Sequence, residues 1–110
     1  MHEYGLTQRI IQTAAQRADG AKVKTITLVV GEASGVLGES IQLYFDILAK
    51  GTPCEGAGVE IEGVKPMLRC RACGRLFVRK PFSFECPCGG EGEPTDIGRE
   101  FYIKQIEVET

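Results

Sequence analysis

Apolar residues recur at helical spacing in two stretches of the chain. Between residues 3 and 18 they fall three or four positions apart, at Leu6, Ile10, Ile11 and Ala14. This spacing places them on one face of a helix, which Asp19 and Gly20 end. A second stripe follows a glycine-rich loop and consists of Ile41, Phe45 and Leu48. We therefore predict two amphipathic helices, over about residues 3–18 and 39–50.

Three other stretches have the composition of β-strands. Residues 22–30 read KVKTITLVV and are rich in β-branched side chains, with Ile26, Leu28 and Val30 on one face. Residues 59–64 and 101–108 are the other two expected strands. No internal repeat interrupts this order. The pattern indicates an α+β fold in which two helices pack on a small, mostly antiparallel β-sheet.

Four of the five cysteines lie in one segment, MLRCRACGRLFVRKPFSFECPCGG, at Cys70, Cys73, Cys86 and Cys88. A C-x-x-C pair followed about a dozen residues later by a second close pair can bring four thiolates to one ion, and zinc suits that set best. Four thiolates complete a tetrahedral shell and leave no position for a substrate. We therefore expect a structural zinc ion rather than a catalytic one.

The cysteine segment is expected to form a zinc-ribbon-like subdomain inserted between two strands of the α+β core. Within it, residues 76–84 predict two short strands joined near Pro81. Residues 65–66 and 92–98 are its expected hinges. The chain then divides into an α+β domain, residues 1–65 and 97–110, and a zinc-binding subdomain, residues 66–96.

The second cysteine pair is C-P-C, one residue shorter than C-x-x-C. We expect this turn to be narrow and to lose the backbone N–H bonds to sulfur of a longer knuckle, so Cys88 is the weakest of the four zinc assignments. Cys54 stands apart in the glycine-rich stretch GTPCEGAG. We interpret it as a surface or small-core residue, with a metal role as the minor alternative.

Charge and composition narrow the choice of partners. The 110 residues carry a net charge of −2, which argues against general nucleic-acid binding. A basic cluster in the cysteine segment leaves that function as an alternative: Arg69, Arg71, Arg75, Arg79 and Lys80. No secretory signal and no apolar run of about 18 residues is present. We expect a cytoplasmic protein that keeps its thiols reduced and does not enter a membrane.

The only histidine is His2. A free terminal amine, the deprotonated amide of residue 2 and the Nδ1 atom of its imidazole form fused chelate rings with three donors in one plane. Planar nitrogen donors suit Ni(II) or Cu(II). Glu3 can supply a fourth donor through its backbone amide or its carboxylate. The alternative is a solvated histidine without a ligand.

Several motifs together resemble the HypA family of hydrogenase-maturation metallochaperones along nearly the whole chain: MHE, LVVGEASGV, GTPCEGAGVEIE and CxxCG…CPCGG. The resemblance implies a cytoplasmic chaperone that carries Ni(II) as transient cargo to the large subunit of [NiFe]-hydrogenase, together with a HypB-type GTPase. It implies nickel on Met1, His2 and Glu3, and structural zinc on the four clustered cysteines. Some relatives also serve urease. The family usually has CPxCG, from which CPCGG departs.

The residues favour no enzyme. One histidine permits no internal Ser/His/Asp triad, and no G-x4-G-K-[ST] phosphate loop is present. Two other classes remain as alternatives, a zinc-ribbon nucleic-acid binder and a zinc-stapled interaction adaptor. A homodimer is left open.

Overall fold

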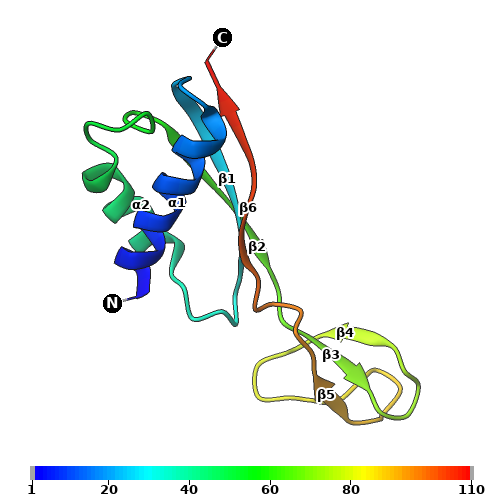
Figure 1. Cartoon of the computed structure of the whole chain (residues 1–110). Helices are drawn as coiled ribbons and strands as arrows, with labels where there is room; N and C mark the ends of the chain where they lie inside the picture. Colours follow the sequence, from blue (N-terminus) through cyan, green and yellow to red (C-terminus); the bar gives the residue numbers. More distant parts are fainter. Residues whose placement is uncertain (1, 110) are drawn as a thin grey trace.

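The computed structural model describes residues 2–109, and for His2 only the backbone. Its helices are α1 (His2–Ala18) and α2 (Gly38–Leu48). Its strands are β1 (Val23–Gly31), β2 (Gly58–Val64), β3 (Met67–Cys70), β4 (Leu76–Val78), β5 (Gly92–Pro94) and β6 (Phe101–Val108). Both helices lie beside the sheet β2-β1-β6, and the sheet β4-β3-β5 forms the opposite end of an elongated molecule (Figure 1). Within the described residues, no helix combines the length and the apolar character needed to cross a membrane.

The larger sheet is built around β1. This strand pairs with β2 in parallel and with β6 in antiparallel orientation, so that Leu28 lies opposite both Ile61 and Ile103. The parallel pair follows from the connection, because α2 carries the chain back to the starting end of the sheet. In the smaller sheet, β3 pairs antiparallel with both of its neighbours. The predicted α+β class with mostly antiparallel pairing is confirmed.

The core lies between the two helices and the larger sheet. Ile10 and Ala14 of α1 and Ile41 and Phe45 of α2 are buried in one cluster with side chains of β1. The side chains of β1 in this cluster are Val23, Ile26, Leu28 and Val30. The predicted helical stripes therefore face the sheet, as the spacing indicated.

Residues 66–96, the cysteine subdomain, differ from the prediction in one respect. Between the cysteine pairs only β4 is a strand; the expected second strand is replaced by an isolated bridge between Lys80 and Ser83. The reason is that Phe82 adopts φ +60°, outside the β region, and Pro81 has no N–H to donate. The sheet is completed instead by β5, which occupies part of the segment expected to be a hinge.

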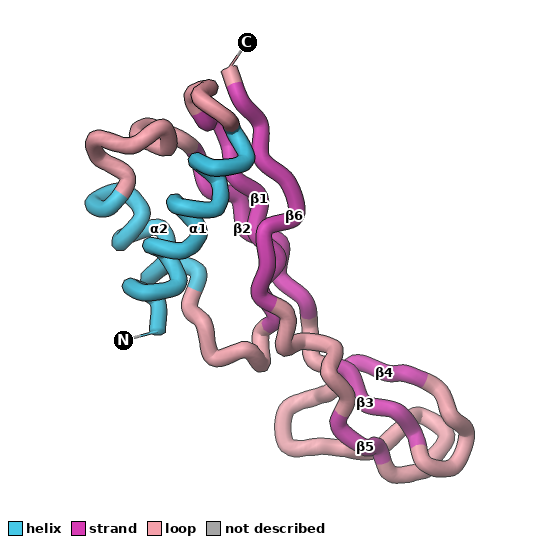
Figure 2. Tube along the Cα trace, in the orientation of Figure 1, coloured by secondary structure: helices cyan, strands magenta, loops and turns pink. Residues whose placement is uncertain are grey.

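The two chain segments that connect the sheets are closely packed. Gly98, with φ +101°, lies against Pro66, and a Cβ atom on it would meet Pro66 Cα at 2.6 Å. The Ala33 amide donates to the Gly98 carbonyl at 2.7 Å, and the Gly31 amide donates to the Glu100 carbonyl at 2.7 Å. The loop after β1 thus fastens the connection between the two ends of the molecule (Figure 2). The division of the chain at residues 66 and 96 stays a prediction.

Cys54 belongs to the core of the helical end. Its side chain is fully buried, and its thiol lies 3.7 Å from the Ile11 carbonyl, to which it can donate. Burial raises the pKa of this thiol, against a smaller opposing effect of the Thr52 side chain. The small-core alternative is therefore correct, and Cys54 lies outside the group of cysteines that could share a metal.

This burial leads to a prediction about thiol chemistry. Removal of the metal by a chelator would free the two cysteine turns, so their four thiols should react with a disulfide reagent at pH 8. Cys54 should stay protected, because it is buried in the helical core, which does not depend on the metal. Mass spectrometry of the labelled chain counts and locates the reactive sites. The Cys54→Ala variant should give the same four. Labelling of Cys54 at the rate of the other four would contradict the prediction.

Candidate metal centre

The four clustered cysteines bring their sulfur atoms to one point. The Sγ atoms of Cys70, Cys73, Cys86 and Cys88 all lie within 4.8 Å of one another, and all four are free thiols. Sγ of Cys70 is 3.4 Å from that of Cys88, and Sγ of Cys73 is 3.8 Å from that of Cys86. A tetrahedral zinc ion with Zn–S bonds of about 2.3 Å needs sulfurs about 3.8 Å apart. The donor set therefore fits zinc.

Two tight turns place these sulfurs. The first follows β3, where the Gly74 amide donates to the Cys70 carbonyl at 3.0 Å with φ +76° at Gly74. In the second, the Gly89 amide donates to the Cys86 carbonyl at 2.8 Å with φ +92° at Gly89. Glycine suits both positions because it has no Cβ to clash at positive φ.

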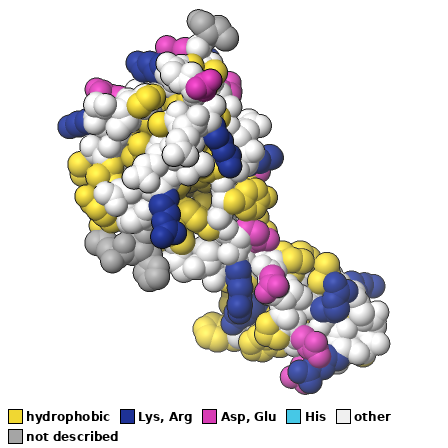
Figure 3. Space-filling view, viewed as in Figure 1, with side chains coloured by type: hydrophobic (Ala, Val, Ile, Leu, Met, Phe, Trp, Pro, Cys, Tyr) yellow, Lys and Arg dark blue, Asp and Glu magenta, His cyan; other side chains and the backbone are white. Residues whose placement is uncertain are grey.

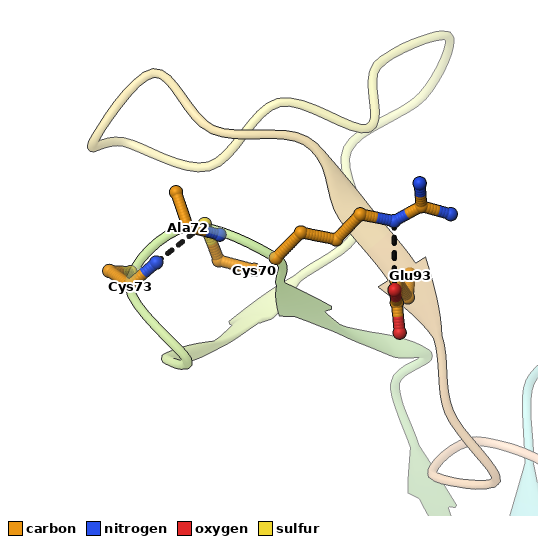
Figure 4. Close-up of polar contacts among 5 residues, drawn as sticks. Cys70, Ala72, Cys73 and Glu93 are labelled. Carbon is orange, nitrogen blue, oxygen red and sulfur yellow. Dashed lines mark hydrogen bonds and ion pairs between the residues drawn. The ribbon is translucent and has the colours of Figure 1, made fainter.

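Backbone amides point at the sulfurs in both turns. The amides of Ala72 and Cys73 donate to Cys70 Sγ at 3.3 and 3.4 Å (Figure 4). In the second turn, the Cys88 amide donates to Cys86 Sγ at 3.5 Å and the Gly90 amide to Cys88 Sγ at 3.4 Å. The expectation that the C-P-C turn loses such bonds is wrong. Pro87 removes one donor, but the amides of residues 88 and 90 replace it.

These contacts shift the pKa values of two neighbouring thiols in opposite directions. The pKa of Cys70 is lowered to about 6, first by the Cys73 amide and then by the Ala72 amide and adjacent sulfurs, against desolvation. The Gly90 amide lowers the pKa of Cys88, but the surrounding sulfurs of the other three cysteines outweigh it and raise that pKa to about 12. Four thiols this close cannot all ionise without a cation among them. A bound dication would stabilise the four thiolates together.

Gly90 matters to the site because it has no side chain, and not because of a positive φ or as a ligand. A Cβ atom on it would lie 2.7 Å from Cys70 Sγ and 2.8 Å from Ala72 Cβ. The only signal in the sequence is the second glycine of CPCGG.

We predict that Gly90→Ala weakens zinc binding about 10- to 100-fold, the usual effect of disturbing groups that orient metal ligands. Competition with a chromophoric chelator measures the zinc affinity. Gly63→Ala is the control, since a Cβ there meets no atom within 4 Å. Equal zinc affinities for the two variants would contradict the prediction.

The basic cluster of the cysteine subdomain is largely engaged within the subdomain itself. The Arg71 side chain forms a salt bridge of 2.8 Å with Glu93, and an Arg69 N–H donates to the Gly74 carbonyl at 2.9 Å. The Arg79 guanidinium lies 4.9 Å from the centre of the Phe84 ring. These contacts favour a solvated face that stabilises the subdomain over a surface for phosphates.

Of the predicted nickel residues, the His2 backbone and Glu3 lie at the start of α1. Met1 falls outside the described residues, as does the side chain of His2. Glu3 lies in the first turn, where its carbonyl accepts a hydrogen bond from the Thr7 hydroxyl, and Thr7 is fully buried. The Tyr4 ring packs edge-on against Tyr44 of α2, with centroids 5.5 Å apart. The first turn is thus fixed to the helical layer, well apart from the cysteine subdomain (Figure 1).

Comparison with known proteins places the chain in a family. Residues 1–108 match the model described as "Hydrogenase/urease nickel incorporation, metallochaperone, hypA". The hydrogenase maturation factor HypA of Caldanaerobacter subterraneus is 43% identical, across 99% of this chain and 100% of that relative. The protein of the same name from Nostoc sp. is 41% identical, across 99% of this chain and 96% of its own length.

Solved structures agree with the fold. A solution structure of a HypA protein aligns with a TM-score of 0.68 at 21% identity, covering 98% of this chain and 96% of that one. The solution structure of the Ni metallochaperone HypA from Helicobacter pylori aligns with a TM-score of 0.62, covering 98% and 97%. The chain therefore belongs to the HypA family of metallochaperones for nickel incorporation into hydrogenase and urease, and is a maturation factor rather than an enzyme.

Proposed function

We propose that this chain binds Ni(II) through the Met1 amine, the amide and imidazole of His2, and Glu3, and delivers it to the large subunit of [NiFe]-hydrogenase in the cytoplasm. The observation that carries the proposal is the family match over residues 1–108, which includes the MHE start. A HypB-type GTPase supplies the GTP hydrolysis, because this chain has no phosphate loop. Urease is a second enzyme that receives this nickel.

The fold supports a terminal nickel site in two ways. The four-cysteine cluster is a complete donor set for zinc, so nickel needs other donors. The structural zinc ion would be held by Cys70, Cys73, Cys86 and Cys88. The second support is that α1 begins at His2, and the first amides of a helix have no carbonyl partner within it. A bound metal can therefore replace the proton of such an amide, which passes to solvent, without breaking a hydrogen bond of the helix.

Blocking the terminal amine tests the terminal site. The zinc-loaded chain with a free amine is titrated with Ni(II) and compared with the same chain acetylated at Met1. Acetylation removes the amine donor, so we expect the absorption of planar Ni(II) to disappear and the affinity to fall at least about 100-fold, which is about 2.8 kcal/mol. Zinc content should stay unchanged.

Two outcomes would contradict the terminal site. One is equal nickel affinity for the acetylated and the native chain. The other is sulfur-to-nickel charge-transfer absorption in the native chain, which would place nickel among the cysteines. His2→Ala, which keeps the amine but removes the imidazole, should weaken nickel binding by itself.

A further inference from the structure

Phe82 is the most exposed large hydrophobic side chain that the structure describes, at 104% relative accessibility. It also adopts φ +60°, a region that side chains with a Cβ rarely occupy. A glycine would relieve this strain, and burial of the ring offsets none of it. Exposed aromatic groups on strained backbone are typical of binding surfaces rather than of cores. A contribution to the stability of the chain therefore does not explain why phenylalanine occupies position 82.

The loop around Phe82 is held in shape rather than loose. Lys80 and Ser83 form a bridge, and the Ser83 amide donates to the Lys80 carbonyl at 3.2 Å. Phe84, 46% exposed, is covered on one side by the guanidinium of Arg79. We call residues 79–84 the Phe82 loop. A rigid aromatic group loses little entropy on binding, which suits an anchor residue.

Concave surfaces flank the loop on both sides. A cavity of about 460 Å³ is lined by Phe77, Val78 and Lys80, among others. A second, of about 290 Å³, is lined by Phe82 and Phe84 together with Gly89 and Gly90. On the lower end of the molecule in Figure 3, hydrophobic side chains lie beside Lys and Arg side chains. The surface can therefore both insert an aromatic ring and receive apolar side chains.

Charge identifies the kind of partner. The Phe82 loop, RKPFSF, contains two cations and no carboxylate, whereas Glu85 lines both flanking cavities and Glu91 the second. Within the part of the chain that the structure describes, neither Arg79 nor Lys80 forms a salt bridge. A matching surface would present an apolar pocket bordered by carboxylates.

The metal centre supports the same loop. The Gly92 amide donates to the Phe84 carbonyl at 2.7 Å, and Glu85 is bridged to Glu91 on the far side of the second cysteine turn. The loop therefore ends where the cysteine turn begins, so a metal that orders the turn would also order the loop.

We propose that the Phe82 loop is the surface that docks the client of nickel delivery, the large-subunit precursor of [NiFe]-hydrogenase, by inserting Phe82 into an apolar pocket bordered by carboxylates. The inference rests on the proposed function. It gives the metal centre a second role, because the metal then shapes the contact with the client as well as the subdomain.

The test uses the zinc-loaded full chain and the purified large-subunit precursor as the probe, with affinity measured by biolayer interferometry. Phe82→Gly should weaken binding at least about tenfold, while zinc content and unfolding midpoint hold or improve, because glycine accepts φ +60°. Lys80→Glu should weaken binding and reduce its dependence on salt. Tyr102→Ala, which removes a half-exposed aromatic ring on β6, is the matched control and should bind as the native chain does.

Unchanged affinity of Phe82→Gly for a precursor that binds the native chain would overturn the inference and leave terminal nickel binding intact. Failure of the native chain to bind the precursor would overturn both the inference and the proposed delivery. The choice of client would be overturned if Phe82→Gly lost only its binding to a HypB-type GTPase. It would also be overturned if Phe82→Gly lost only its self-association. The nickel titration of the native chain separates these results from failure of the nickel site.

Discussion

Gly31→Ala should lower the free energy of unfolding by about 3 kcal/mol, the upper end of what overpacking a filled site costs. A Cβ atom at this position would lie 2.0 Å from the Gly98 carbonyl oxygen and 2.1 Å from its carbon. Both are backbone atoms, which cannot rotate away as a side chain could. The strands must separate, which strains the hydrogen bond from the Gly31 amide to the Glu100 carbonyl.

Urea unfolding followed by far-UV circular dichroism measures this loss. Gly63→Ala is the matched control, because it introduces the same methyl group into the neighbouring strand β2, where no atom lies within 4 Å. It should change the stability by less than about 1 kcal/mol. Similar midpoints for the two variants would show that the contact between β1 and the segment after β5 is looser than described.

This contact illustrates what local patterns in the sequence cannot predict. The two helices follow from the spacing of their apolar residues, which records the face that each helix buries. The three long strands follow from their composition. Gly31 and Gly98 approach through the backbone, across 67 residues of chain, and glycine is too common in turns to signal such a contact. The parallel direction of β2 is also absent from its side-chain pattern, because it is set by the connection through α2.

The metal centre, too, has features that the sequence predicts and features that it does not. The grouping of four cysteines followed from their spacing and is confirmed by the sulfur cluster. The strand β5 was missed because its three residues, Gly92–Pro94, carry no strand signal. The amides that bind sulfur in the C-P-C turn do not follow from the turn length, which gives the number of residues but not the direction of each N–H. Zinc as the resident ion stays a prediction.

Cys88→Ser should reduce zinc affinity by more than the 10- to 100-fold that outer-shell changes cost, because it removes a thiolate ligand outright. Sγ of Cys88 lies 3.4 Å from that of Cys70, so the sulfur occupies one corner of the cluster despite the short C-P-C turn. Cys54→Ser is the matched control, since it makes the same atom change at a thiol outside the cluster.

Chelator competition measures both zinc affinities, and a cobalt-substituted sample reports the number of sulfur ligands through its charge-transfer absorption. Cys88→Ser should lose part of that absorption, whereas Cys54→Ser should retain all of it and lose only stability, because a hydroxyl replaces a buried thiol. Full zinc affinity in Cys88→Ser would mean that three cysteines suffice. The fourth position would then be open, and the centre could exchange a ligand instead of serving only to hold the fold.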